Sequence, residues 1–499
     1  MLVPRPTRLR QRAGQFVFGP ATALRATPGA EPAARLLRRY LRPATGLPLP
    51  LSATGTVLFA LDERLVGLGD EGYALTVGEQ AVVLRARRPA GLLHGVQTIR
   101  QLLPVEALGE TPAPGVRWAM PCADVTDVPR LPWRGAMLDV ARHFQPVRFL
   151  RRFVDLLALH KLTVLHLHLT DDQGWRMPVA AYPALTEVGG VRSSTQLGPA
   201  GSDRFDGVRH GGAYTTAELR GLVAYAAARG VRIVPEIDMP GHARAALAAY
   251  PWLGNQPERR LPVWTEWGVS DAVFGVHDRV FAFLHTVLGE VMDVFPGEHV
   301  HIGGDEVPWT EWAASPVALD RVAREGLAGP HALRAWFLRR IGAFLLDHGR
   351  VPVCWDDSAG DVPPLDPRTV VMPWQEGASV PRGHPVVLTP YRATYLDYPQ
   401  STDDGERPGQ PGGVVTMSDV YHQPIPDDPA VLGSQCQLWT EQAPRAEDVE
   451  YLAFPRLCAL ADALWSARPG WAAFRAAMTV HEHRLAAMSV AHRSLTATS

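Results

Sequence analysis

In the chain beyond residue 133, strand-like apolar runs alternate with stretches whose apolar residues recur three and four positions apart, the spacing of an amphipathic helix. The expected strands are 134–140, 164–170, 231–238, 299–306, 351–357, 369–375, 384–390 and 434–441. The clearest expected helices are 146–160, 215–229, 278–294, 331–348 and 448–464. Eight strands separated by helices predict an α/β fold, a (β/α)8 TIM barrel, whose chemistry collects at the C-terminal ends of the strands.

The first part of the chain has a different pattern. Short strand-like runs occur at 15–18, 56–60, 73–77 and 81–85, with helical stretches at 31–42 and 89–103. This mixture predicts a small α+β domain. The segment 111–127, with three prolines, is the expected linker. We therefore place the domains at 1–125 and 126–499. We expect the helical stretch 471–491, at the end of the second domain, to cover the barrel.

Composition narrows the range of partners. The 499 residues carry a formal net charge of −2, which gives no sign of a nucleic-acid surface or a polybasic membrane patch. We therefore expect a neutral small molecule or a glycan as the partner. Lys161 is the only lysine, which leaves almost no room for a Schiff-base mechanism. The four cysteines are too scattered for a zinc knuckle and too few for a disulfide framework, so we expect buried free thiols.

The basic N-terminus has no continuous apolar segment, and no run of 18 apolar residues occurs in the chain. These features predict a cytoplasmic protein without a secretion signal or a membrane span.

Polar residues cluster where the expected strands end. The stretch HIGGDE at 301–306 carries an apolar strand into two glycines and then into adjacent carboxylates, Asp305 and Glu306. In a barrel such strand ends converge on a single mouth. Six of the eight expected strands end in an acid, an arginine or a tryptophan, namely Asp139, Arg142, Asp171, Asp172, Asp238, Asp305, Glu306, Trp355, Asp356, Trp439 and Glu441.

Histidines on two strands allow two interpretations. Alternation in VLHLHLT places His166 and His168 on one face of a strand, either as a metal site or as hydrogen-bonded residues inside the barrel. We favour the second, because no lysine is available there to bridge two metals as a carbamate. His242 follows a Pro-Gly turn after another strand, so we expect it to reach the mouth and orient a carboxylate.

Tryptophans beside acids suit a sugar, whose C–H faces stack on aromatic rings while its hydroxyls seek charged acceptors. Hydrolysis of a glycoside needs an acid that protonates the leaving oxygen, and Glu306 is the natural candidate. A retaining enzyme usually needs a second carboxylate as nucleophile. Asp305 is poorly placed for that role, and spacing alone leaves Asp171, Asp238 and Glu441 open.

Six ordered motifs then identify a family. RGAMLDVARHF, LHLHLTDDQGWR, PEIDMPGH, HIGGDE, TYLD and LWTE together resemble glycoside hydrolase family 20, the β-N-acetylhexosaminidases. The leading stretches GDEGYAL and GLLHGVQTIRQLLP are similar to the small domain that precedes the barrel in that family. The resemblance implies that the substrate supplies the nucleophile through its 2-acetamido group, an exception to the usual two-carboxylate scheme.

The resemblance also implies roles for single residues. Glu306 would be the acid and then the base, Asp305 would orient the acetamide N–H, and Tyr395 would bind its carbonyl oxygen. Asp171 and His242 would form a relay behind Glu306, and Asp238 would support the site from behind.

The sugar itself would be held by a second set of side chains. By the same likeness, Arg134 would grip the ring hydroxyls at carbons 3 and 4. The remaining contacts would come from the walls Trp355, Trp374 and Trp439 and from the acids Asp397 and Glu441. Such a closed pocket implies exo action on a terminal β-N-acetylhexosaminide glycan or chitooligosaccharide, with no metal and no cofactor.

Two other functions compete with this hypothesis. A metal-dependent amidohydrolase on the same barrel would use His166, His168 and His242 with an aspartate and would lose activity with a chelator. A non-catalytic glycan-binding protein would not need the Asp305–Glu306 pair. The choice between GlcNAc and GalNAc and the oligomeric state are left open.

Overall fold

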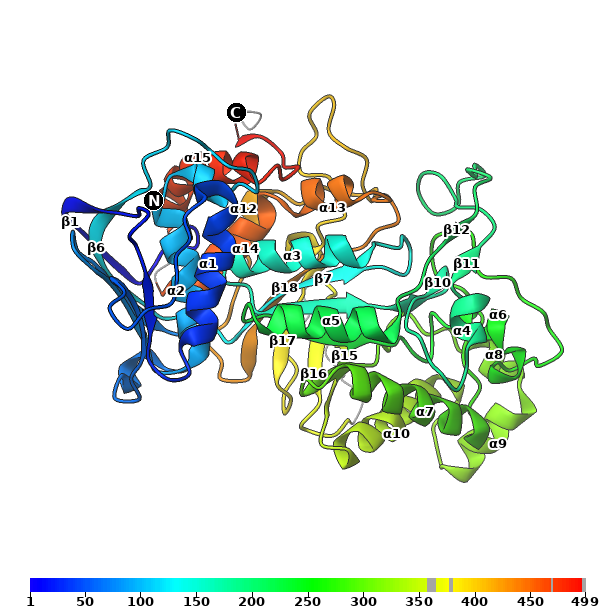
Figure 1. Cartoon of the computed structure of the whole chain (residues 1–499). Coiled ribbons are helices and arrows are strands. Elements are labelled where there is room, and N and C mark those ends of the chain that lie inside the picture. Colours follow the sequence, from blue (N-terminus) through cyan, green and yellow to red (C-terminus); the bar gives the residue numbers. More distant parts are fainter. Residues whose placement is uncertain (357–364, 377–379, 468–469, 496–499) are drawn as a thin grey trace.

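The computed structural model describes residues 1–356, 365–376, 380–467 and 470–495. An N-terminal domain, the barrel and a set of long loops follow one another along the molecule (Figure 1). The domain and the loops lie at opposite ends of the barrel. The last residue of the expected strand 351–357 lies outside the described residues.

The N-terminal domain is a six-stranded sheet covered by the helices α1 (Glu31–Thr45) and α2 (Pro89–Leu102). In spatial order its strands are β1 (Arg8–Val17), β6 (Ala119–Asp127), β4 (Tyr73–Val77), β5 (Val82–Ala86), β3 (Val57–Leu61) and β2 (Leu24–Ala26). The small α+β domain is therefore present.

The linker expected over 111–127 is wrong in its second half. Residues 119–127 form β6, which pairs antiparallel with both β1 and β4, so a domain boundary at 125 would cut a strand. The prolines obscured a strand pattern that buries Met120 and Cys122 and, after a change of phase, Ala123 and Val125. The connection between the domains is the short segment 128–132.

The predicted barrel is confirmed, because all eight expected strands pair in parallel around a closed ring. In chain order they are β7 (Trp133–Asp139), β8 (Val164–His168), β13 (Arg232–Glu236), β14 (His299–His301), β15 (Val351–Asp356), β16 (Val370–Pro373), β17 (Val386–Leu388) and β18 (Val431–Leu438). The expected strand 299–306 is too long, since β14 ends at His301 and its acids lie in the following loop.

The predicted helices surround this ring as α3 (Val147–Leu159), α5 (Thr216–Ala227), α7 (Asp278–Val294) and α10 (Leu333–Asp347). The expected helix 448–464 is two helices, α13 (Ala446–Ala453) and α14 (Arg456–Trp465), which meet at Pro455. A proline has no N–H to continue a helix. Between β15 and β17 the described residues contain no helix.

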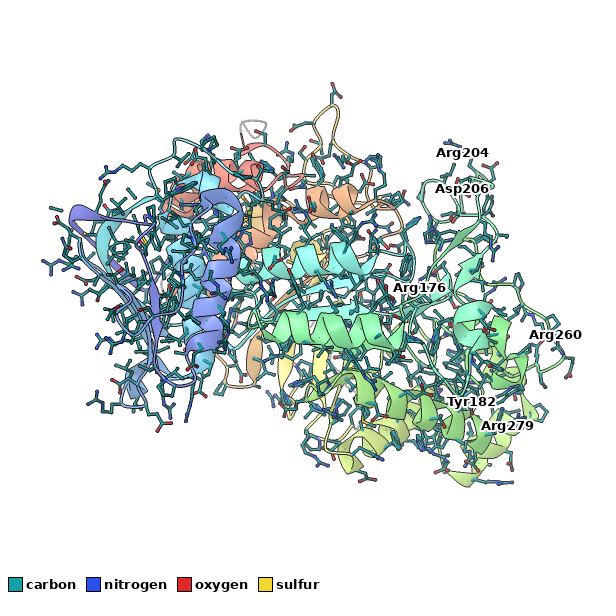
Figure 2. The ribbon with its side chains drawn as sticks, viewed as in Figure 1. Arg176, Tyr182, Arg204, Asp206, Arg260 and Arg279 are labelled. Atoms are coloured by element: carbon teal, nitrogen blue, oxygen red, sulfur yellow. The ribbon has the colours of Figure 1, made fainter. Side chains whose placement is uncertain are left out.

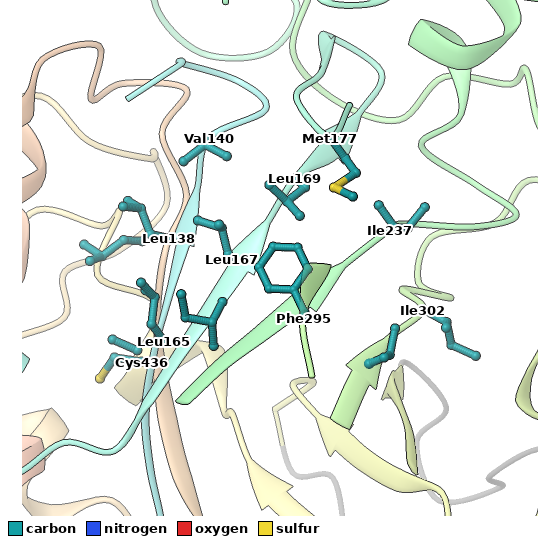
Figure 3. Close-up of a cluster of buried hydrophobic side chains, with 14 of the residues drawn as sticks. Leu138, Val140, Leu165, Leu167, Leu169, Met177, Ile237, Phe295, Ile302 and Cys436 are labelled. Atoms are coloured by element: carbon teal, nitrogen blue, oxygen red, sulfur yellow. The ribbon is translucent and has the colours of Figure 1, made fainter. Parts of the chain in front are cut away.

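Strand β8 shows how the two faces of the barrel wall differ. Leu165, Leu167 and Leu169 belong to the apolar core between strands and helices (Figure 3), whereas His166 and His168 point into the barrel. All five side chains are buried. The alternation expected from the sequence is therefore present, and the barrel interior is polar at this level.

Buried ion pairs and a C-terminal helix join the two domains. The Lys161 ammonium lies 2.7 Å from Asp127 at the end of β6, and Arg134 at the start of β7 pairs with Glu71. Helix α15 (Trp471–Ala487) contacts both parts, because Arg484 donates to the Gln101 carbonyl at 2.9 Å while His481 meets His160 at 2.8 Å. The C-terminal helix thus covers the N-terminal domain as well as the barrel.

Long loops extend from the opposite end of the barrel. Figure 2 shows Arg204 and Asp206 near the tip of one of them and Arg176 at its base. Arg176 is fully buried and donates to the carbonyls of Gly190 and Gly212 at 2.7 and 2.8 Å, which anchors both ends of this loop.

No helix in the described part of the chain is both long and apolar enough to cross a bilayer. All four cysteines are buried free thiols, as expected.

Candidate active site

The loop after β14 brings two acids to the mouth of the barrel. Gly303 and Gly304 have φ of 63° and 103°, a left-handed conformation that favours glycine. A Cβ on Gly303 would lie 1.7 Å from Oδ1 of Asp238, so only glycine allows this close approach. Arg334 of α10 donates to the Gly304 carbonyl and holds the loop from outside. The double glycine therefore sets the position of Asp305 and Glu306.

Glu306 and His242 face each other across the mouth. Both have left-handed backbones, with φ of 46° and 49°, which is uncommon for residues other than glycine and is found at functional sites. His242 Nε2 lies 3.7 Å from Oε2 of Glu306 and 3.9 Å from Oδ2 of Asp305. The Glu306 side chain is 41% exposed and that of Asp305 13% exposed. A bound molecule can therefore reach Glu306.

Two further acids stand behind His242. Its Nδ1 lies 3.3 Å from Oδ1 of Asp171 and 3.4 Å from Oδ2 of Asp172. Burial opposes charge on this imidazole, but the Asp171 and Asp172 carboxylates outweigh it and raise the pKa of His242 well above its usual value. The structure thus brings together Asp171, His242 and Glu306, and the raised pKa favours the protonated form of His242.

Asp238 lies beneath the acid pair. It is buried, and its Oδ1 accepts a hydrogen bond from the Gly304 N–H at 3.3 Å. Burial and then the charge of Asp305 raise the pKa of Asp238 well above its usual value. The raised pKa favours the protonated form of Asp238 beside Asp305.

Aromatic rings form one wall of the mouth. The centroids of Trp355 and Trp439 are 6.1 Å apart, those of Trp439 and Tyr395 are 6.2 Å apart, and those of Tyr395 and Trp374 are 6.2 Å apart. Trp355 is fully buried, whereas the other three rings are partly exposed. Burial and then the charge of Asp305 raise the pKa of the Tyr395 hydroxyl well above its usual value, so it stays a donor. This wall can stack on an apolar face of a ligand.

Buried acceptors beside this wall lack partners. Asp397 Oδ1 and Glu441 Oε2 accept no hydrogen bond from any described residue, and Trp374 Nε1 donates none. Burial raises the pKa of both acids, and the charge of Glu441 raises that of Asp397 further. Unpaired buried polar atoms are costly unless something fills them. Two acid oxygens beside an aromatic wall suit a ligand rich in hydroxyl groups.

The expectation for Arg134 is wrong. Its guanidinium pairs with Glu71 of the N-terminal domain and donates to the Lys161 carbonyl at 2.9 Å, at the end of the barrel opposite the mouth. The arginine at the mouth is Arg142, whose Nη2 lies 2.8 Å from Oδ2 of Asp171 and whose guanidinium carbon lies 4.9 Å from the Trp439 ring centroid. Its place just after a strand end was visible in the sequence.

Sequence reasoning missed Glu236, the last residue of β13. Its carboxylate is fully buried inside the barrel, and its oxygens lie 2.9 Å from His166, 2.5 Å from His168 and 2.9 Å from His301. The signal was available, since Glu236 lies two positions before Asp238 on the same face of its strand.

Several sets of these residues lie close enough to offer metal ligands. They include His166 with Glu236 and His301, and Asp171 with Asp172 and His242. Hydrogen bonds account for part of each set, because Gln435 donates to His166 Nδ1 and the Asp172 N–H donates to Asp171, whereas His166 Nε2 and His242 Nδ1 face carboxylates outside hydrogen-bonding geometry. Of the two interpretations of His166 and His168, the one that the sequence favoured, hydrogen-bonded residues inside the barrel, fits β8.

The chain matches two family models over nearly its whole length. Residues 131–468 match the model of the glycosyl hydrolase family 20 catalytic domain, and residues 1–128 match that of domain 2 of the same family. These ranges meet at the connection between β6 and β7.

Curated relatives and solved structures agree with this match. The chain is 35% identical over 485 residues to a β-hexosaminidase of Porphyromonas gingivalis, with 93% of this chain covered but only 60% of that longer protein. It is 34% identical to a β-hexosaminidase of Akkermansia muciniphila, with 85% and 86% of the two chains covered.

Two solved structures are also similar. A β-N-acetylhexosaminidase from Streptomyces coelicolor matches with a TM-score of 0.84 and 32% identity over 99% of this chain and 97% of that chain. A mutant Streptomyces plicatus β-hexosaminidase in complex with GlcNAc matches with a TM-score of 0.84 and 31% identity over 99% and 96% of the two chains.

Proposed function

This chain belongs to glycosyl hydrolase family 20, and on that premise we propose that it removes terminal β-linked N-acetylhexosamine from the non-reducing ends of glycans. The observation that carries the proposal is that Asp305 and Glu306 both face His242, beside a wall of aromatic rings and two acid oxygens that accept no hydrogen bond from the described residues. The acetamido group of the substrate acts as the nucleophile, so no enzyme carboxylate has to attack.

In the first step, the acetamide carbonyl oxygen attacks the anomeric carbon as the bond to the leaving oxygen breaks. Glu306 gives its proton to that oxygen, and the sugar becomes a bicyclic oxazolinium ion. Asp305 accepts a hydrogen bond from the acetamide N–H and balances the positive charge that develops there, while the Tyr395 hydroxyl donates to the carbonyl oxygen.

In the second step, the Glu306 carboxylate takes a proton from water, whose oxygen attacks the anomeric carbon from the face that the leaving group left. The oxazolinium ring opens and restores the acetamide. Two inversions at one carbon give overall retention of the β configuration, and Glu306 ends the cycle protonated.

The pair behind Glu306 supports this change of role. With its raised pKa, His242 stays an imidazolium held by Asp171, and it stabilises Glu306 once that side chain has lost its proton. Asp171 in turn is held by Arg142, whose charge keeps the pKa of that carboxyl well below its usual value despite burial.

The geometry of the pocket favours a terminal sugar and exo action. The oxygens of Asp397 and Glu441 that have no partner among the described residues are suited to accept hydrogen bonds from the hydroxyls at carbons 4 and 6 of a terminal sugar. Arg142, rather than Arg134, is the guanidinium that pairs with Asp171 on this side of the barrel. Both GlcNAc and GalNAc fit the proposal, since they differ in one hydroxyl.

A comparison of two aryl glycosides tests the proposed function. Hydrolysis of an aryl β-N-acetylglucosaminide should exceed that of the matching β-glucoside by several orders of magnitude, because only the first carries the acetamide. A thiazoline that mimics the oxazolinium should inhibit. Equal rates on the two substrates, or activity that a chelator abolishes, would instead support a protein nucleophile or the metal-dependent alternative.

A further inference from the structure

Glu236 is a fully buried carboxylate inside the barrel, and the reaction described above gives it no role. Each of its oxygens faces two side-chain nitrogens. Oε2 lies 2.5 Å from Nδ1 of His168 and 2.9 Å from Nε2 of His166. Oε1 accepts the indole N–H of Trp355 at 2.8 Å and lies 2.9 Å from Nδ1 of His301. A buried carboxylate stays ionised only with such compensation.

One of these contacts leads towards the mouth of the barrel. The other nitrogen of His168, Nε2, lies 3.0 Å from Oδ2 of Asp171. Since both ring nitrogens face carboxylate oxygens, the ring satisfies both only when both nitrogens carry protons. Burial would lower the pKa of His168, but Glu236 and Asp171 outweigh it and raise it well above its usual value. Glu236, His168, Asp171, His242 and Glu306 thus form one continuous series of contacts.

We propose that Glu236 is a positioning residue for glycoside hydrolysis, an inference that rests on the proposed function. Through His168 it fixes the Asp171 carboxylate against His242. Through the indole N–H it fixes the plane of Trp355 in the pocket wall. One carboxylate therefore aligns the support behind Glu306 and a surface on which the sugar lies, although it touches neither the sugar nor the acid.

The substitution Glu236→Gln tests the proposal, because it keeps the size of the side chain and removes its charge. The rate constant kcat on an aryl β-N-acetylglucosaminide should fall roughly 10- to 100-fold, as when an outer partner of a catalytic group is lost, and KM should rise a few-fold. A fall confined to thermal stability would overturn it.

Asp127→Asn is the matched control. Asp127 is also fully buried, accepts a tryptophan N–H, from Trp465 at 2.7 Å, and pairs with a buried cation, Lys161 at 2.7 Å. It lies at the opposite end of the barrel, so its substitution should lower stability but leave kcat and KM within about twofold of the wild type. The same kcat in both variants would overturn the proposal.

A double-mutant cycle separates positioning from general damage. If Glu236 acts through Asp171, the effects of Glu236→Gln and Asp171→Asn on kcat should combine to much less than their product. The effects of Asp127→Asn and Asp171→Asn on kcat should multiply in the double variant. Effects of Glu236→Gln that also multiply would contradict the branch through His168.

A measurement on the unaltered residue keeps the test independent of whether Glu236→Gln folds. In wild-type enzyme labelled with ¹⁵N-histidine, the His168 ring, assigned by the signals that are lost in His168→Gln, should be protonated on both nitrogens at pH 8, and its signals should move on Asp171→Asn substitution. A His168 ring with only one protonated nitrogen would overturn the inference. An inactive wild type would instead refute the proposed function, whereas an active wild type with an unaffected Glu236→Gln variant would refute this inference alone.

Discussion

The chemistry of this protein depends on a few side chains whose neighbours set their charge. Burial and the charge of Asp305 raise the pKa of Asp238, and Asp171 raises the pKa of His242 against the effect of burial. Arg142 is the shared counter-ion, 2.8 Å from Asp171 and 3.5 Å from Asp139. It is therefore the arginine whose loss should affect catalysis.

Two arginine substitutions can be compared directly. Arg142→Met should lower kcat/KM on the aryl substrate by about 10- to 100-fold, since Asp171 and Asp139 lose a charged partner. Arg134→Met removes the partner of Glu71 at the other end of the barrel and should lower the unfolding temperature while leaving kcat/KM within about threefold. If Arg134→Met lowered kcat/KM more than Arg142→Met, Arg134 would be the arginine that contacts the sugar and the assignment of Arg142 would be wrong.

This contrast also shows what the sequence could predict at this scale. Arg142 was among the residues expected at the barrel mouth because it follows the end of a strand. The sugar-binding role implied by the family motif was instead given to Arg134, the first arginine of RGAMLDVARHF, eight positions earlier. Glu236 was missed because a polar residue within an apolar run resembles an isolated exception. Only the closure of the ring shows that three histidines meet it there.

At the scale of elements, periodicity predicted the order of strands and helices, and backbone chemistry decided where they end. Gly303 and Gly304 stop β14 early, and Pro455 divides one expected helix into two. Segment 119–127 was misjudged because the three prolines over 111–127 are typical of a linker, although pairing with two neighbouring strands makes 119–127 strand β6. Loop conformation, which depends on tertiary contacts, was beyond prediction.

The loop anchored by Arg176 allows a prediction about such contacts. Arg176 also donates to the carbonyls of Val140 and Ala141, at 2.9 and 2.5 Å, just after β7. Arg176→Met leaves buried carbonyls unpaired and should lower the free energy of unfolding by about 3 kcal/mol. Urea denaturation measures this. Arg204→Met, at the exposed tip (Figure 2), should change it by less than about 0.5 kcal/mol. Equal losses would argue against the anchor.

At the scale of the whole molecule, the barrel and its contact with the C-terminal helix contain uncharged histidines, among them His160, which meets His481 of α15. Burial lowers the pKa of His143, His160, His166 and His299 to about 4, so these rings are neutral in the fold. In the unfolded chain they bind protons below about pH 6.5. The unfolded state therefore gains protons as the pH falls, and stability should decrease between pH 6.5 and pH 4.

Urea midpoints at pH 6.5, 5.5 and 4.5 test this pH dependence. Each such histidine contributes up to about 1.4 kcal/mol per pH unit in this window. His168 and His242, whose pKa values are raised, stay protonated in the fold and add an opposing slope only near pH 6.5, where the unfolded rings have lost part of their protons. His299→Asn should make the loss of stability with falling pH shallower, by about the contribution of one histidine. A stability that rises towards pH 4 would contradict the account.

The central claim is that the acetamide oxygen of the substrate is the nucleophile, with Asp305 as its partner. The most direct measurement follows kcat/KM for aryl glycosides whose N-acetyl group carries zero, one, two or three fluorines. Fluorine withdraws electrons from the carbonyl oxygen, so the account predicts a steep fall along the series, by orders of magnitude at the trifluoro substrate. Rates that stay level would mean that a carboxylate of the enzyme attacks, and the proposed roles of Asp305 and Tyr395 would be wrong.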